Sequence, residues 1–113
     1  MLQFKPTNYF ISKCKITFIM VEDMKLFHRL ILDMTSTIKT LYHQYSNETL
    51  TMISEPAENN ISMFKDEIEN LKQQYYHLAV DLFLYRYSLE DSTKVYNMIS
   101  DVADRCVRQL IIL

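Results

Sequence analysis

Five residues of the sequence could support nucleophilic or metal chemistry: His28, His43, His77, Cys14 and Cys106. A zinc site needs such ligands at short, regular spacings, and these residues do not have them. A nucleophilic cysteine needs a convergent histidine, an orienting group and an oxyanion pocket. Cys106 and His77 could form the cysteine–histidine pair, but the sequence indicates neither an orienting group nor an oxyanion pocket. We therefore expect no catalytic, metal or cofactor site, and cysteines that stay reduced.

Three other features could indicate a catalytic carboxylate pair, a base-stacking element or glycosylation, but the surrounding sequence favours none of these. The acidic residues on either side of residue 60 suit a solvated first turn of a helix, where they favour the helix dipole, better than a catalytic pair. The run Tyr85-Arg86-Tyr87 resembles a base-stacking element, but no basic groove surrounds it. The glycosylation sequons at Asn47 and Asn60 carry little weight without a signal peptide.

The composition excludes further classes of protein. The 113 residues contain no glycine, although average usage would give about eight, so a glycine-rich phosphate loop is ruled out. Twelve basic and fourteen acidic residues give a net charge of −2, which provides no electrostatic surface for nucleic acid. No stretch approaches the roughly 20 apolar residues of a membrane span. We expect no nucleic acid, membrane or small-molecule substrate as a partner.

The chain divides into an N-terminal leader, residues 1–19, and a helical domain, residues 20–113. In the leader, Cys14, Ile16 and Phe18 alternate with polar residues, as in a short strand. In the domain, apolar residues follow heptad spacing, which predicts three helices over about residues 20–53, 61–87 and 92–111.

A proline and polar capping residues mark the boundaries between the predicted helices. Pro56 interrupts the first helix, and Asn60 is the expected N-cap of the second. Ser88 and Asp91 have capping-box spacing before the third helix, and Asp91 and Ser92 are alternative caps. Several charged residues are expected outside the first heptad seam: Asp23, Lys25, Arg29, Asp33 and Lys39.

These seams predict an all-α fold in which a long antiparallel helical hairpin carries a shorter third helix. A third helix of about 20 residues is too short to cover two seams of about 45 Å. We therefore expect a partner chain to complete a four-helix bundle. The residues expected at the partner interface are Phe27, Ile31, Met34, Ile38, Phe64, Ile68, Leu71, Tyr75, Leu78 and Leu82.

The third predicted helix contains the segment SDVADRCVRQL, residues 100–110. It resembles the Mediator complex subunit 11 family, whose last helix carries the pattern matched here by Ser100, Asp101, Val102, Ala103, Cys106 and Leu110. The resemblance implies a non-enzymatic subunit of the Mediator head module, a nuclear coactivator of RNA polymerase II transcription. It also implies Mediator subunit 22 as the partner in the four-helix bundle.

Two alternatives stay open from the sequence. The chain can be a self-contained helical regulator, for example a viral or host-response protein, that binds an amphipathic partner helix; without the resemblance, the expected location is the cytoplasm. An enzyme is the weakest alternative, because it requires a deep polar pocket that nothing in the sequence indicates.

Overall fold

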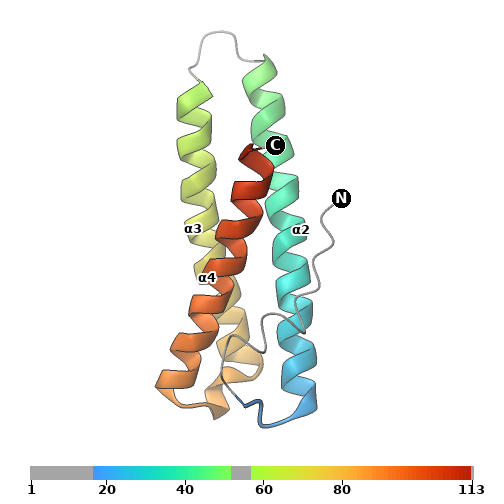
Figure 1. The fold of residues 1–113 in the computed structure, drawn as a ribbon, viewed down its shortest axis with the longest axis vertical. Coiled ribbons are helices and arrows are strands. Elements are labelled where there is room, and N and C mark those ends of the chain that lie inside the picture. Colours follow the sequence, from blue (N-terminus) through green and yellow to red (C-terminus); the bar gives the residue numbers. More distant parts are fainter. Residues whose placement is uncertain (1–16, 52–56, 113) are drawn as a thin grey trace.

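The computed structural model describes residues 17–51 and 57–112, and all regular structure within these ranges is helical. In chain order the elements are helix α2 (Val21–Thr51), helix α3 (Ala57–Leu82), the 3-10 turn η1 (Leu84–Arg86) and helix α4 (Leu89–Ile112). Figure 1 shows α2 and α3 running antiparallel, with α4 packed against both. The predicted all-α class is confirmed. Residues 1–16 of the expected leader lie outside the described residues.

The start of α3 differs from the sequence prediction. The helix begins at Ala57, directly after Pro56 in the sequence. Asn60 is buried one turn inside it, so the prediction that Asn60 caps the helix is wrong. Ala57, Glu58 and Asn59 contain no helix breaker, and the helical pattern therefore extends back to the proline.

The connection between α3 and α4 is a tight turn built without glycine. Helix α3 ends at Leu82, and the expected extension to Tyr87 is replaced by η1. The amide of Tyr87 donates to the carbonyl of Leu84 over 2.9 Å, and Tyr87 itself is extended, with φ −107°. Because a 3-10 turn followed by an extended residue needs no positive φ here, glycine is not required.

Helix α4 begins earlier than expected, at Leu89, and Ser88 caps it. The hydroxyl of Ser88 accepts a hydrogen bond of 3.1 Å from the amide of Asp91, which satisfies one of the orphan donors of the first turn. The capping-box spacing in the sequence therefore identified the true start of this helix.

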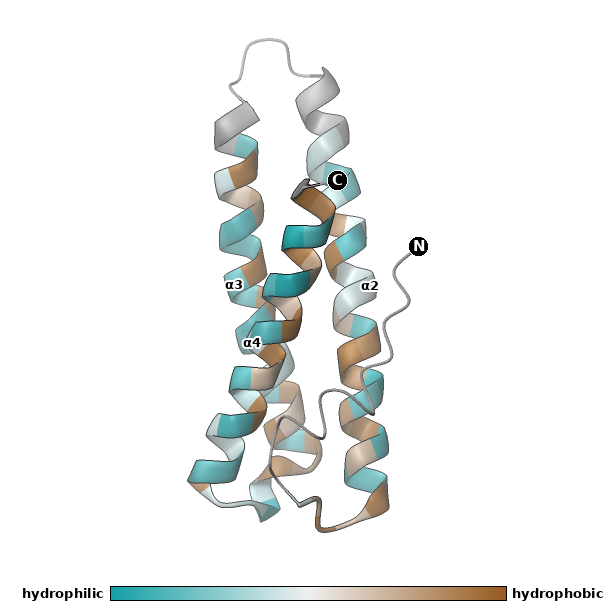
Figure 2. Cartoon of the chain, viewed as in Figure 1, coloured by the Kyte–Doolittle hydropathy of each residue, from teal (hydrophilic) through white to brown (hydrophobic). Residues whose placement is uncertain are grey.

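The three helices share one hydrophobic core. Figure 2 shows hydrophobic and hydrophilic residues alternating along each helix, as expected for amphipathic helices. The apolar core residues that are less than 3% exposed are Ile31, Met34, Ile38, Phe64, Ala79, Phe83, Leu84, Val95, Ile99, Val102, Ala103 and Cys106. Within the described part of the chain, no helix is long and apolar enough to span a membrane.

Candidate partner interface

The structure divides the ten predicted interface residues into two groups. Leu78 and Leu82 are each 43% exposed. The other eight are at most 7% exposed and form part of the chain's own core: Phe27, Ile31, Met34, Ile38, Phe64, Ile68, Leu71 and Tyr75.

The eight buried residues require a correction. They were expected to face another chain because the third helix looked too short to cover both seams. Helix α4 packs against both α2 and α3 and runs along most of the hairpin (Figure 1). It begins at Leu89, three residues before the predicted start, and contributes its own apolar seam to the core. The third helix thus supplies the cover that we expected from a partner.

Helix α4 lies along one side of α3. The ammonium of Lys72 lies 2.8 Å from the carboxylate of Asp104 on α4. The amide of Gln73 donates to the hydroxyl of Tyr96 on α4 over 3.0 Å. These contacts place α4 along the side of α3 that carries Lys72 and Gln73.

Polar contacts between α2 and α3 fix the register of these two helices. The phenol of Tyr75 donates a hydrogen bond of 2.5 Å to the carboxylate of Asp33, and its oxygen lies 3.2 Å from the hydroxyl of Thr37. Burial, and then the Asp33 carboxylate, raise the pKa of Tyr75. The phenol therefore stays protonated and remains a donor at neutral pH.

Four leucines extend from this contact toward the end of the bundle that holds η1. Leu26 and Leu30 precede Asp33 by seven and three residues, and Leu78 and Leu82 follow Tyr75 by three and seven residues. Residues at these spacings share one side of a helix, and the two helices are antiparallel (Figure 1). The register therefore places Leu30 near Leu78 and Leu26 near Leu82. We call these four residues the leucine face.

The leucine face is apolar and only partly covered by the chain. Leu26 and Leu30 are half-buried and pack against the core, whereas Leu78 and Leu82 are exposed. Full burial of a leucine is worth about 1.5–3 kcal/mol, so a part of that free energy remains unused on each of these side chains. Leu78 and Leu82 are therefore among the exposed large apolar side chains of α3, together with Ile61 and Met63 nearer its start.

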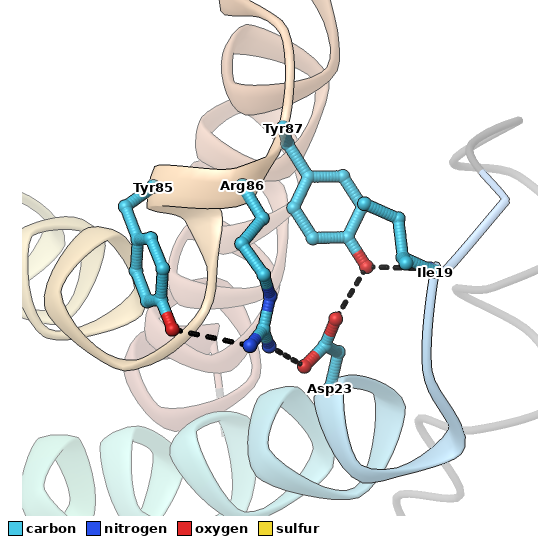
Figure 3. Close-up of polar contacts among 5 residues, drawn as sticks. All are labelled: Ile19, Asp23, Tyr85, Arg86 and Tyr87. Atoms are coloured by element: carbon cyan, nitrogen blue, oxygen red, sulfur yellow. Dashed lines mark hydrogen bonds and ion pairs between the residues drawn. The ribbon is translucent and has the colours of Figure 1, made fainter.

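One end of the bundle is held by a buried carboxylate (Figure 3). Asp23, at the start of α2, has a side chain that is 1% exposed, and the guanidinium of Arg86 pairs with it. The hydroxyl of Tyr87 donates to the same carboxylate over 2.8 Å and accepts from the amide of Ile19 over 2.7 Å. Burial and the contact with Asp23 raise the pKa of Tyr87, so this hydroxyl also stays protonated.

Aromatic rings pack beneath this polar cluster. Phe18 lies 6.1 Å from Phe27 and 6.3 Å from Phe83 between ring centroids. Tyr87 lies edge-on to Phe83, with the centroids 6.0 Å apart. Edge-to-face aromatic pairs at such distances are favourable beyond the area they bury. The aromatic packing therefore connects the start of α2, the end of α3 and the residue that follows η1.

Sequence reasoning missed the roles of Asp23, Lys72 and Arg86. Asp23 was expected outside the first seam, but it is fully buried, and that prediction is wrong. The signal was present: Asp23 precedes Phe27 by four residues and so lies on the core side of α2. The residues of the run Tyr85-Arg86-Tyr87 contact other parts of the chain. Arg86 pairs with Asp23 and also stacks over the ring of Tyr85, 5.0 Å from its centroid, and Tyr87 donates to Asp23.

The structure does not bring together the residues that could support catalysis or metal binding. Cys106 is buried, and burial raises the pKa of its thiol, which makes it a poor nucleophile. Among the described residues, no three His, Cys, Asp or Glu side chains are placed to hold a metal ion. Asn60 is buried, so its sequon is inaccessible in this fold. Cys14 lies outside the described residues.

Comparison of the chain with protein-family models, with curated proteins and with solved structures finds no match.

Proposed function

We propose that this chain is a non-enzymatic helical interaction subunit that binds a helix of another protein on its leucine face. The observation that carries the proposal is the exposure of Leu78 and Leu82 on the heptad stripe that also contains the buried Tyr75. A heptad stripe normally packs against a neighbouring helix along its whole length. At Leu78 and Leu82 the stripe of α3 is exposed and is not buried by another helix of the described chain.

A partner helix on the leucine face would complete a four-helix bundle. It would contact α2 and α3 on the side opposite α4, where a fourth helix packs at a small angle to its neighbours. An amphipathic helix with apolar residues at spacings of three, four and seven is the matching shape. The chain's own contribution to such an interface is limited to the exposed leucines and their surroundings.

The resemblance of residues 100–110 to Mediator subunit 11 supplies one specific form of this proposal. The chain would then be a nuclear coactivator subunit of the Mediator head module, paired with Mediator subunit 22. Three of the matching residues, Val102, Ala103 and Cys106, are buried, and a packed helix needs small apolar side chains at such positions. The specific support therefore comes from Ser100, Asp101 and Leu110.

A second candidate is a self-contained helical regulator that binds an amphipathic helix. The observation that favours it is the chain's own core, in which eight of the predicted interface residues are buried. A core of this kind leads us to expect that the chain folds alone, and that its partner binds to a folded surface. The expected location is then the cytoplasm.

Purification of tagged chains from their native source tests the proposal. The Leu78→Glu/Leu82→Glu variant places two charges on the leucine face. The Thr93→Glu/Asn97→Glu variant places two charges, at the same spacing, on the exposed side of α4. We expect the same stoichiometric partner with the wild type and with the α4 variant, and its loss with the leucine variant.

The identity of the co-purifying chains separates the two forms of the proposal. Recovery of Mediator head subunits supports the coactivator form, whereas recovery of one unrelated helical target supports the regulator. A partner that is retained equally by both variants contradicts the leucine face as the binding surface. Recovery of the wild-type chain without a partner contradicts the interaction function itself.

A further inference from the structure

We infer that the helix bound on the leucine face carries basic residues along the edges of its apolar stripe. This inference rests on the proposed function and adds the chemistry of the partner. The observation behind it is the set of charges around the four leucines, in which acidic side chains outnumber basic ones and form no ion pair within the described part of the chain.

Three acidic side chains border the leucine face. Glu22 precedes Leu26 by four residues, and Asp33 follows Leu30 by three, which places both on the α2 edge of the face. On α3, Asp81 follows Leu78 by three residues and lies on the α3 edge. All three acidic residues are exposed. Among the described residues, none of them forms an ion pair.

Few basic groups oppose these carboxylates. Two exposed basic residues lie along the α2 edge: Lys25 follows Glu22 by three residues, and Arg29 precedes Asp33 by four. Arg86, near the end of the face, is already paired with Asp23 and stacked over Tyr85. Lys72, on the other side of α3, pairs with α4. The edges of the leucine face are therefore net acidic.

Asp33 provides the most specific contact point. One of its carboxylate oxygens accepts the hydrogen bond from Tyr75, and within the described residues its other oxygen has no side-chain donor. A lysine or arginine on the partner can reach this oxygen, because long basic side chains extend from an apolar stem to a charged head. Asp81 offers a second acceptor on the opposite edge.

The same charges argue against a second copy of this chain as the occupant. A two-fold symmetric contact places each surface against itself. The net acidic edges of the two copies would then lie in one interface, and like charges across an interface are unfavourable. A different chain with basic edges avoids this repulsion.

A selection experiment tests the inference with the full-length chain. The probe is a displayed library of single helices in which a leucine stripe is fixed and the residues on both edges of the stripe are randomised. Selection is carried out on the wild type, on Asp33→Asn/Asp81→Asn, and on Leu78→Glu/Leu82→Glu. Glu90→Gln, which removes an exposed acid from the start of α4, is the matched control for charge.

We expect Lys and Arg to be enriched at the edge positions on the wild type and on Glu90→Gln, and this enrichment to disappear on Asp33→Asn/Asp81→Asn. Selected helices should lose affinity for that double variant by roughly 2- to 30-fold, the factor that two exposed ion pairs provide. They should not bind Leu78→Glu/Leu82→Glu. Their affinity should also fall as salt is raised.

The remaining outcomes overturn the inference in distinguishable ways. Helices that require the leucines but show no preference for basic edges contradict the charge rule and leave the proposed function intact. Failure to select any helix that depends on Leu78 and Leu82 contradicts both. A wild-type dimer in sedimentation that Leu78→Glu/Leu82→Glu dissociates assigns the face to a second copy, which also overturns the inference.

Discussion

The hydroxyl of Tyr87 donates a hydrogen bond of 2.8 Å to the carboxylate of Asp23, which lies 64 residues earlier in the chain. The same carboxylate pairs with Arg86, so two residues at the α3–α4 turn converge on the first turn of α2. A buried carboxylate is costly unless its charge is paired and hydrogen-bonded. This cluster therefore fixes the glycine-free turn against α2, at the end of the bundle where the leucine face lies.

Removing the cation from this cluster should destabilise the fold strongly. Arg86→Leu leaves the Asp23 carboxylate, which is 1% exposed, with Tyr87 as its remaining donor among the described residues. Loss of one partner of a buried pair costs about 3 kcal/mol or more. We expect a loss of about 3 kcal/mol in the free energy of unfolding, measured by urea denaturation.

Lys94→Ala is the control for that measurement. Lys94 pairs with Glu90 over 3.7 Å, and Glu90 is well exposed, so its loss should change stability by less than about 0.5 kcal/mol. Equal effects of the two substitutions would contradict a structural role for the Asp23 cluster.

The contact between Tyr75 and Asp33 should make stability depend on alkaline pH. Burial and Asp33 raise the pKa of Tyr75 above its ordinary value of 10.0. A group whose pKa is raised by folding contributes stability below its unfolded pKa, and this contribution is lost as pH rises through its folded pKa. At neutral pH, Tyr75→Phe should cost about 1 kcal/mol, the value of one hydrogen bond.

Urea denaturation of the wild type and Tyr75→Phe over a pH series measures this dependence. The difference between the two should be constant from neutral pH to about pH 10, and it should shrink above that value as the phenol ionises. A difference that already shrinks between about pH 7 and pH 9 would show that Tyr75 ionises early, against the environment described here.

Much of this fold is predictable from the sequence because it depends on periodicity. The heptad seams located three amphipathic helices, and Ser88 with Asp91 marked the start of α4. The other predicted helix ends were displaced: α3 begins at Ala57, before the expected cap Asn60, and ends at Leu82. At the end of α3 the hydrogen bonds of the 3-10 turn decide the boundary, and the heptad pattern carries no information about them.

The partner surface was predictable only in part. Heptad spacing identifies which residues face a neighbouring helix, but not whether that neighbour belongs to the same chain. Phe27 and Leu78 lie in equivalent seams, yet the chain's own core covers the first and not the second. The polar clusters escaped detection because the hydrogen bond from Tyr87 to Asp23 joins residues far apart in sequence.

Two charge substitutions on one stripe of α3 should destabilise the chain to very different extents. Leu71 is buried and Leu78 is exposed, although they lie seven residues apart. Leu71→Glu buries an unpaired charge and should unfold the chain, whereas Leu78→Glu should lower stability by less than about 1 kcal/mol. Circular dichroism melting of both variants checks this, and a well-folded Leu71→Glu protein would contradict the observed core.

The cap of α4 provides a further test of the turn. Ser88→Ala removes the acceptor for the Asp91 amide and should cost about 1 kcal/mol of stability. Ser88→Asp keeps an acceptor at the same position and should restore most of it. Thermal melts of the two variants make the comparison, and identical losses would exclude the side-chain cap as the cause.

Site-specific photocrosslinking in cells tests the central claim most directly. A photoreactive amino acid is placed at position 78 or 82 on the leucine face, or at position 97 on the exposed side of α4. We expect one discrete crosslinked partner from positions 78 and 82 and none from position 97. The same crosslinked product from all three positions, or no product from positions 78 and 82, would contradict the leucine face as the surface that binds a partner helix.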